Sequence, residues 1–229
     1  MRLALSILFG LIGFGFLLWL GFWQLDRLEQ KREILAEIDA RIGGTFQPLP
    51  APGAANPERD RYLPVMLEGT LGEDEILVLV SQKHVGAGYR VISPLILAEG
   101  RRILIDRGFI PVQDRAAERS ASGEITVEGN LHWPDDRTPS TPQNDIAGNT
   151  WFARDVAEMA ELLDTEPLLV IARRVTPREP GVTPLPVDSS GIPNDHLQYA
   201  ITWFSLAAFW FGMISVLIWR QYKGKEGIG

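Results

Sequence analysis

The chain contains no cysteine and few other side chains that bind metal ions. Its 229 residues include only three His and four Met. Without cysteine it cannot form a disulfide, attach haem through C-x-x-C-H, run a thiol redox pair or offer a thiolate to copper. The four Met are widely scattered, which argues against the thioether site of a copper chaperone.

The sequence also lacks the motifs that carry common enzyme chemistry. No G-x-S-x-G, H-E-x-x-H or phosphate-binding loop is present. Gly86–Gly88 is too short for a nucleotide-binding fingerprint and indicates a turn before a strand. His84 and His132 fall near predicted strand ends, where a surface or structural role is expected. We therefore expect no catalytic residues and a protein that is not an enzyme.

Charge is missing from two long apolar runs, one near each end of the chain. Residues 3–25 and 197–219 each contain 23 residues without Asp, Glu, Lys or Arg. At about 1.5 Å per residue, each run forms a helix of roughly 34 Å, enough to cross a hydrocarbon core of about 30 Å. Both are predicted to be transmembrane helices. The alternative for the first is a cleaved signal peptide, but its length and its ending in GFWQLDRL favour a retained anchor.

The distribution of basic residues predicts the orientation in the membrane. Three of them follow the second run: Arg220, Lys223 and Lys225. No Lys or Arg lies between Glu179 and His196, so the positive-inside rule puts the C-terminus in the cytoplasm. Three basic residues after the first run argue the other way, but acidic residues are interleaved with them. We predict transmembrane helices at 3–25 and 197–219, a periplasmic domain at 26–196 and a cytoplasmic tail at 220–229.

The segment between the two runs is acidic and rich in strand patterns. It carries 18 Lys and Arg and 28 Asp and Glu, a net formal charge of −10, which argues against binding nucleic acid. Short β-branched stretches predict strands at 62–70, 75–82, 89–97, 101–112, 124–133 and 167–174. Helices are predicted at 26–42, continuing the first span, and at 155–164 with Asp155 as N-cap, with loops at 48–60 and 176–193. The fold class expected is a membrane protein in which two transmembrane α-helices flank a mostly antiparallel β (α+β) extramembrane domain.

One histidine stands at the start of the second apolar run. His196, Tyr199 and Trp203 are spaced i, i+3 and i+7, so they share one helix face at the depth where membrane meets water. One interpretation is an aromatic belt with a capping histidine. The other is an axial haem ligand, with the apolar macrocycle against the aromatic face and its propionates reaching water.

The two spans also have patterns typical of helices that pack together. Five residues of the first run share one face: Gly10, Gly13, Leu17, Gly21 and Gln24. In the second run Ala208 and Gly212 form a small-xxx-small pair, a spacing that lets helix backbones approach closely. The alternative is the ordinary composition of membrane helices.

Four segments together resemble the surfeit locus 1 family of assembly factors for haem–copper cytochrome c oxidase. They are GFWQLDRLEQK (Gly21–Lys31), GYRVISPL (Gly88–Leu95), LIDRGFIP (Leu104–Pro111, with Arg115 after it) and NDHLQYAITWFSLA (Asn194–Ala207). The resemblance covers essentially the whole chain, with the same two-span plan. Phe109 stands where the family usually has Trp, and Asp106 where Asn is common.

The resemblance implies a role in delivering haem a to oxidase subunit I or inserting it there. It implies that His196 binds the haem iron, with Tyr199, Thr202 and Trp203 as the pocket wall. Three residues of the first motif would face that wall if the spans pair: Gly21, Trp23 and Gln24. Haem A synthase and the oxidase copper chaperone are further expected partners. The alternative is a membrane-tethered scaffold that stabilises nascent subunit I without binding haem itself. A chain beginning directly with its span fits the bacterial inner (cytoplasmic) membrane, with two passes and both termini cytoplasmic.

Overall fold

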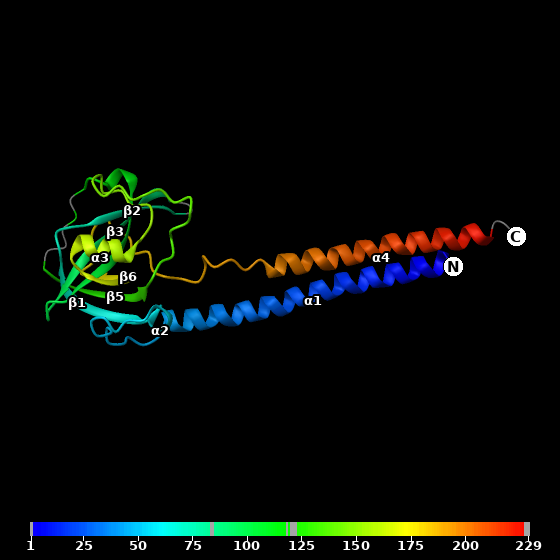
Figure 1. Cartoon of the computed structure of the whole chain (residues 1–229), viewed down its shortest axis with the longest axis horizontal. Helices are drawn as coiled ribbons and strands as arrows, with labels where there is room; N and C mark the ends of the chain where they lie inside the picture. Colours follow the sequence, from blue (N-terminus) through cyan, green and yellow to red (C-terminus); the bar gives the residue numbers. More distant parts are fainter. Residues whose placement is uncertain (1, 83–84, 118, 120–122, 227–229) are drawn as a thin grey trace. The chain divides into compact units, whose positions relative to one another are not determined.

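The computed structural model describes residues 2–82, 85–117, 119 and 123–226 (Figure 1). Within it are two compact units. One combines residues up to Glu37 with those from Ser189 onward, and the other comprises Ile38–Asp188. His84 lies outside the described residues, so its predicted role stays a prediction.

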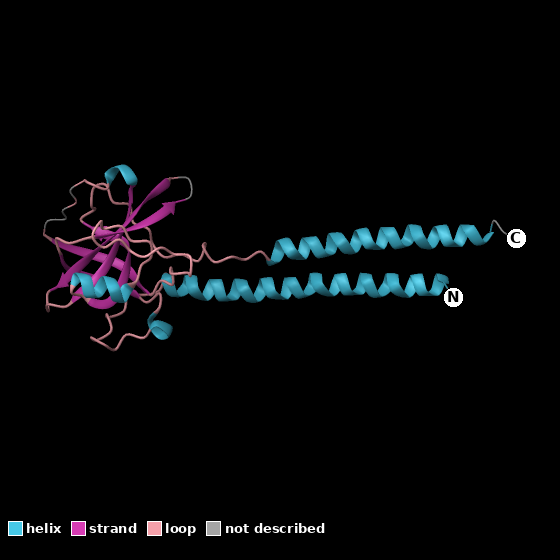
Figure 2. Ribbon diagram, turned by 45° about the horizontal axis from the view of Figure 1, so that its top comes forward, coloured by secondary structure: helices cyan, strands magenta, loops and turns pink. Residues whose placement is uncertain are grey.

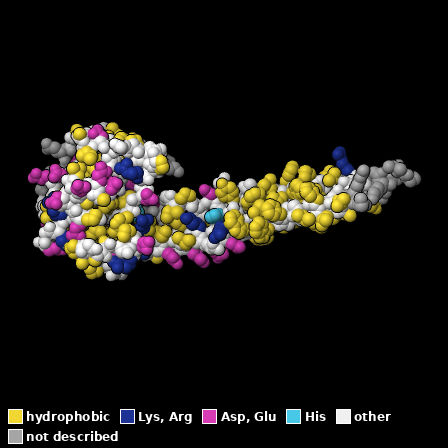
Figure 3. Space-filling model, viewed as in Figure 1, with side chains coloured by type: hydrophobic (Ala, Val, Ile, Leu, Met, Phe, Trp, Pro, Cys, Tyr) yellow, Lys and Arg dark blue, Asp and Glu magenta, His cyan; other side chains and the backbone are white. Residues whose placement is uncertain are grey.

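The first unit is a pair of long helices that run side by side in opposite directions (Figures 1 and 2). Helix α1 spans Arg2–Ile42 without a break, as expected for a first span that continues outward, and α4 spans His196–Glu226. Both are long and apolar enough to cross a membrane, with mean hydropathies of 2.2 and 1.9 in their most apolar windows. Apolar side chains cover most of the pair in Figure 3. The chain is thus a membrane protein with two candidate spans.

The second unit is built on six strands, close to the predicted ranges. They are β1 (Pro64–Leu71), β2 (Ile76–Gln82), β3 (Gly86–Leu97), β4 (Arg102–Pro111), β5 (Glu124–His132) and β6 (Glu166–Thr176). The sheet order is β1-β5-β6-β4-β3-β2, and an additional pairing of β1 with β3 closes five strands into a ring that leaves β2 outside. The pairings are antiparallel, as predicted, except that β4 and β6 are parallel.

Alternation along the strands divides the core into layers. On β6, Val170 and Ala172 join the cluster formed by all five ring strands. Leu169 and Ile171 point to the other face and pack in a cluster with α3 (Val156–Leu163). The predicted N-cap of α3 is confirmed, because the Asp155 carboxylate accepts a hydrogen bond from the Glu158 N–H at 3.2 Å. Two short elements inside predicted loops or strand ends were not expected: α2 (Pro57–Asp60) and the 3-10 turn η1 (Val112–Asp114).

A bulge in β4 buries two neighbouring charged residues. The register with β3 shifts between Val91 and Ile92, opposite Asp106, Arg107 and Gly108, whose φ of 130° suits glycine. Asp106 accepts a hydrogen bond from Arg90 at 2.6 Å. Burial raises the pKa of the Asp106 carboxyl, while Arg90 and Arg154 oppose that rise.

Arg107 has a separate set of partners. It pairs with Glu179, whose Oε2 lies 2.9 Å from Arg107 Nε, and it donates to Ser93 Oγ at 3.0 Å and to Glu75 at 3.3 Å. Arg119 also pairs with Glu75. The two middle segments of the family resemblance therefore supply buried ion pairs of the β unit.

His132 has a structural role. Its ring stacks on Tyr62 with centroids 5.5 Å apart. Burial, helped by Arg154 and Arg61, lowers the pKa of His132 from 6.5 to about 4, so the ring is neutral at pH 7.

Removing Glu179 tests the importance of the Arg107 cluster. Glu179→Ala leaves a buried guanidinium without its main partner, and we expect the free energy of unfolding to fall by about 3–5 kcal/mol. For a domain of this size that lowers the Tm by roughly 10 °C. The control is Arg174→Ala, because the Arg174 side chain is 69% exposed in its pair with Glu128. A melting curve in which both variants shift equally would contradict a special role for the buried pair.

Candidate functional site

Glycines of α1 bring the two helices of the first unit into close contact. A Cβ atom built on Gly10 would lie 2.5 Å from Ile214, and one built on Gly21 would lie 2.5 Å from Phe204. The Cβ of an alanine at Gly13 would lie 2.7 Å from the Trp210 ring. The predicted packing role of these three glycines is confirmed, because a larger side chain at any of them would collide with a side chain of α4.

The small residues that α4 contributes differ from those predicted. Ala208 is exposed, and a Cβ on Gly212 meets nothing within 4 Å, so the small-xxx-small prediction was wrong. Ala200 and Ala207 are 1% exposed and Ile214 is 8% exposed. Residues spaced seven apart all face the partner helix along one line of contact, the seam. A residue next to one of them in sequence points about 100° away from that line. This repeat is the signal in the sequence that could have identified the buried alanines.

Three polar contacts bridge the pair. Gln221 Nε2 donates to Ser6 Oγ at 3.2 Å, and Trp210 Nε1 donates to the Gly10 carbonyl at 3.0 Å. At the other end, His196 Nδ1 and Gln24 Oε1 lie 2.8 Å apart. These contacts join residues 172 to 215 positions apart in the chain. The structure thus brings together two residues that the sequence assigned to one site from separate motifs.

The Gln24 contact determines which ring nitrogen of His196 is available. Because the amide oxygen only accepts hydrogen bonds, Nδ1 carries the hydrogen, and in the neutral ring Nε2 keeps its lone pair. Among the described residues no hydrogen bond to Nε2 is found. This is the arrangement of a metal-binding imidazole, in which a partner of the distal nitrogen fixes the tautomer.

The other predicted site residues lie around this contact in different ways. Trp203 is half-buried and Tyr199 is 54% exposed on the same stretch of α4. The Thr202 hydroxyl donates to the Gln198 carbonyl at 2.9 Å on the exposed side of the helix. Gly21 contacts Phe204 and not the predicted wall. Trp23 is 41% exposed.

This set of groups matches the chemistry of a haem. A haem needs an axial nitrogen, flat apolar surface for its ring, and water or cations at its carboxylate edge. His196 offers the nitrogen, and the aromatic residues of α4 offer the surface. Their position where the apolar run begins suits a molecule with one apolar and one charged side.

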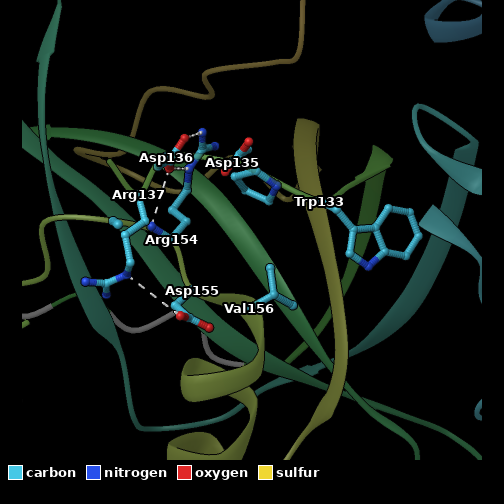
Figure 4. Close-up of a pocket in the computed structure, with 9 residues that line it drawn as sticks. Trp133, Asp135, Asp136, Arg137, Arg154, Asp155 and Val156 are labelled. Carbon is cyan, nitrogen blue, oxygen red and sulfur yellow. Dashed lines mark hydrogen bonds and ion pairs between the residues drawn. The ribbon is translucent and has the colours of Figure 1, made fainter. Parts of the chain in front are cut away.

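A pocket of about 220 Å³ in the β unit is a second candidate (Figure 4). Four of its five charged side chains form two ion pairs: Arg154 Nε lies 2.6 Å from Asp136, and Arg137 lies 4.0 Å from Asp155. Although burial alone would raise the pKa of Asp136, Arg154 keeps it lowered. Since both arginines of the lining are held in ion pairs, the pocket has the character of a structural network.

The close contact of α1 and α4 can be tested with cysteines, because the chain has none of its own. A Cβ on Gly10 lies 3.5 Å from the Ile214 Cβ, within the range that a disulfide requires. We expect Gly10→Cys with Ile214→Cys to form an intramolecular disulfide on mild oxidation, detected as a mobility change on a non-reducing gel. Gly15→Cys with Ile214→Cys is the control, since Gly15 has no neighbour within 4 Å. Equal cross-linking of both pairs would contradict the observed seam.

Comparisons with known proteins agree with these features. The SURF1 family matches residues 11–208. A SURF1-like protein of Monosiga brevicollis is 32% identical over 226 residues, covering 91% of this chain and 84% of the relative. A SURF1-like protein of Rickettsia bellii is 30% identical over 222 residues, covering 93% and 88%, and human Surfeit locus protein 1 is 28% identical over 221 residues, covering 84% and 72%. With its two candidate spans, its β domain and a match that includes both motifs of the helix pair, the chain belongs to the SURF1 family.

Proposed function

We propose that the protein is an assembly factor for haem–copper cytochrome c oxidase that binds haem a at the outer end of its helix pair and assists its insertion into subunit I. Membership of the SURF1 family supports the role in oxidase assembly. The observation that carries haem binding is the 2.8 Å contact between His196 Nδ1 and Gln24 Oε1. That contact orients a lone pair on Nε2 for an iron atom.

A single imidazole is a sufficient protein ligand for this cofactor. The porphyrin itself supplies four nitrogen ligands to iron and leaves the axial positions to the protein. Gln24 holds the His196 ring in one tautomer and one orientation, so the ring does not have to reorganise when it binds. Second-sphere hydrogen bonds of this kind typically change metal affinity 10- to 100-fold.

The aromatic residues next to His196 contribute through apolar contact. Burying apolar surface is worth about 25 cal/mol per Å². Trp203 and Tyr199, two turns and one turn along α4, offer such a surface to the macrocycle. Loss of the imidazole alone would therefore weaken haem binding without abolishing it.

The proposed location is the bacterial inner membrane, with the β domain in the periplasm. The beginning of α1 and the end of α4 lie at the same end of the helix pair, as two passes through a membrane require (Figure 1). The basic residues after the second span favour a cytoplasmic position for that end. Subunit I would receive the haem at the outer end of the helix pair. Haem A synthase would supply it, and the oxidase copper chaperone would act on the same subunit.

Two substitutions test the role of the His196–Gln24 pair. We expect His196→Ala to lower the haem content of protein purified from cells that make haem a, and to shift its absorption bands, because the axial ligand is gone. Gln24→Leu should give a smaller defect, with about tenfold weaker haem binding, because the ring remains but its orientation is released. Optical spectra and pyridine-haem quantification measure both.

The matched controls are His84→Ala, which removes another histidine, and Gln198→Leu, which removes an exposed glutamine of α4. Both should keep the haem content of the parent protein. If His196→Ala also keeps that content and unshifted bands, His196 is a capping residue. The scaffold role without bound haem would then be the better account.

A further inference from the structure

Arg27 lies one turn outward from Gln24 on α1 and has an unneutralised charge. Its guanidinium lies 5.6 Å from the centroid of the Trp23 ring and donates to Gln30 Oε1 at 2.8 Å. Within the described part of the chain, no carboxylate pairs with it, whereas most arginines of the β unit form ion pairs. A cation in this state is free to bind an incoming anion.

Contacts near the middle of α4 identify one flank of the line along which the two helices pack. There Trp210 packs against Phe9, with ring centroids 5.3 Å apart, and its ring also lies against Gly13. His196 precedes Trp210 by 14 residues, which is two of the seven-residue repeats seen in the buried alanines. Both side chains therefore project toward the same flank of α4.

The same displacement along α1 brings Arg27 to that flank. Fourteen residues lead from Phe9 to Trp23 and from Gly13 to Arg27. The two helices are antiparallel and pack along one line. A step of fourteen residues forward on α1 therefore corresponds to a step of fourteen residues back on α4, from Trp210 to His196. By this repeat Trp23 and Arg27, both exposed, are placed on the flank of the pair that carries the histidine.

We propose that Arg27 binds a carboxylate at the edge of the haem whose iron is bound by His196, with Trp23 holding the guanidinium in place. This inference rests on the proposed function. Arginine presents two parallel N–H donors that match a carboxylate, and stacking on an aromatic ring reduces the freedom that it must lose. Arg27 lies about 4.5 Å beyond Gln24 along the helix axis, on the side away from the apolar run. A haem oriented in this way has its ring toward the membrane and its propionates toward water.

The test separates carboxylate recognition from iron binding by using two probes. The purified full chain in detergent is titrated with ferric protoporphyrin IX and with its dimethyl ester, which keeps the iron but has no free carboxylates. We expect Arg27→Gln to weaken binding of the free acid about 10- to 100-fold, the range for one charge-assisted hydrogen bond, and to leave binding of the ester unchanged. The ratio of the two affinities is compared between the variant and the parent chain, because the effect of the detergent on each probe is the same in both.

Two further variants make the result specific. Arg27→Lys keeps the charge and should restore part of the preference for the free acid. Arg32→Gln makes the same charge change on α1 but lies with Leu25 and Glu29 along another stripe of the helix, so it should keep the full preference. Loss of the preference in Arg32→Gln, or its retention in Arg27→Gln, would overturn the assignment to Arg27 while leaving haem binding intact.

His196→Ala distinguishes failure of this inference from failure of the proposed function. It should weaken binding of both probes by the same factor, because both contain iron. If the parent chain binds neither probe, haem binding itself is refuted, and the assignment to Arg27 is overturned with it.

Discussion

The helix pair depends on close approach at three glycines. Gly10, Gly13 and Gly21 face Ile214, Trp210 and Phe204 so closely that an added Cβ atom would collide with these side chains. In lipid the hydrophobic effect does not drive helices together, so packing and polar contacts must do so. The glycines therefore set the register in which each residue of α1 meets its partner on α4.

That register has a consequence for the polar side chains. A polar group in apolar surroundings is costly unless it finds a partner. His196 and Gln24 are hydrogen-bond partners for each other, and their contact leaves the second imidazole nitrogen of His196 available. The His196 ring therefore stabilises the helix pair through Nδ1 and can bind a ligand through Nε2. Stability and binding at this site thus arise from the same contact.

Sequence patterns predicted the elements of this protein well and the contacts between them less well. Both spans, the continuation of α1, the six strands and the cap at Asp155 follow from local composition and periodicity. The parallel pairing of β4 with β6 and the buried partners of Arg107 depend on residues far apart in the chain, which local patterns do not encode. On α4, two kinds of small-residue spacing were present, and only three-dimensional packing selects Ala200 and Ala207 over Ala208 and Gly212. The partnership of His196 with Gln24 could be suspected from two motifs, but its hydrogen bond required the register of the helices.

The most direct test of this account is the tautomer of His196 in the protein without haem. Nitrogen NMR of the full chain in detergent, labelled with ¹⁵N-histidine and assigned with His196→Ala, distinguishes the protonated ring nitrogen from the bare one. We predict hydrogen on Nδ1 and a bare Nε2, and loss of this preference in Gln24→Leu. A His196 ring with hydrogen on Nε2, or one that exchanges between both forms in the parent protein, would contradict it.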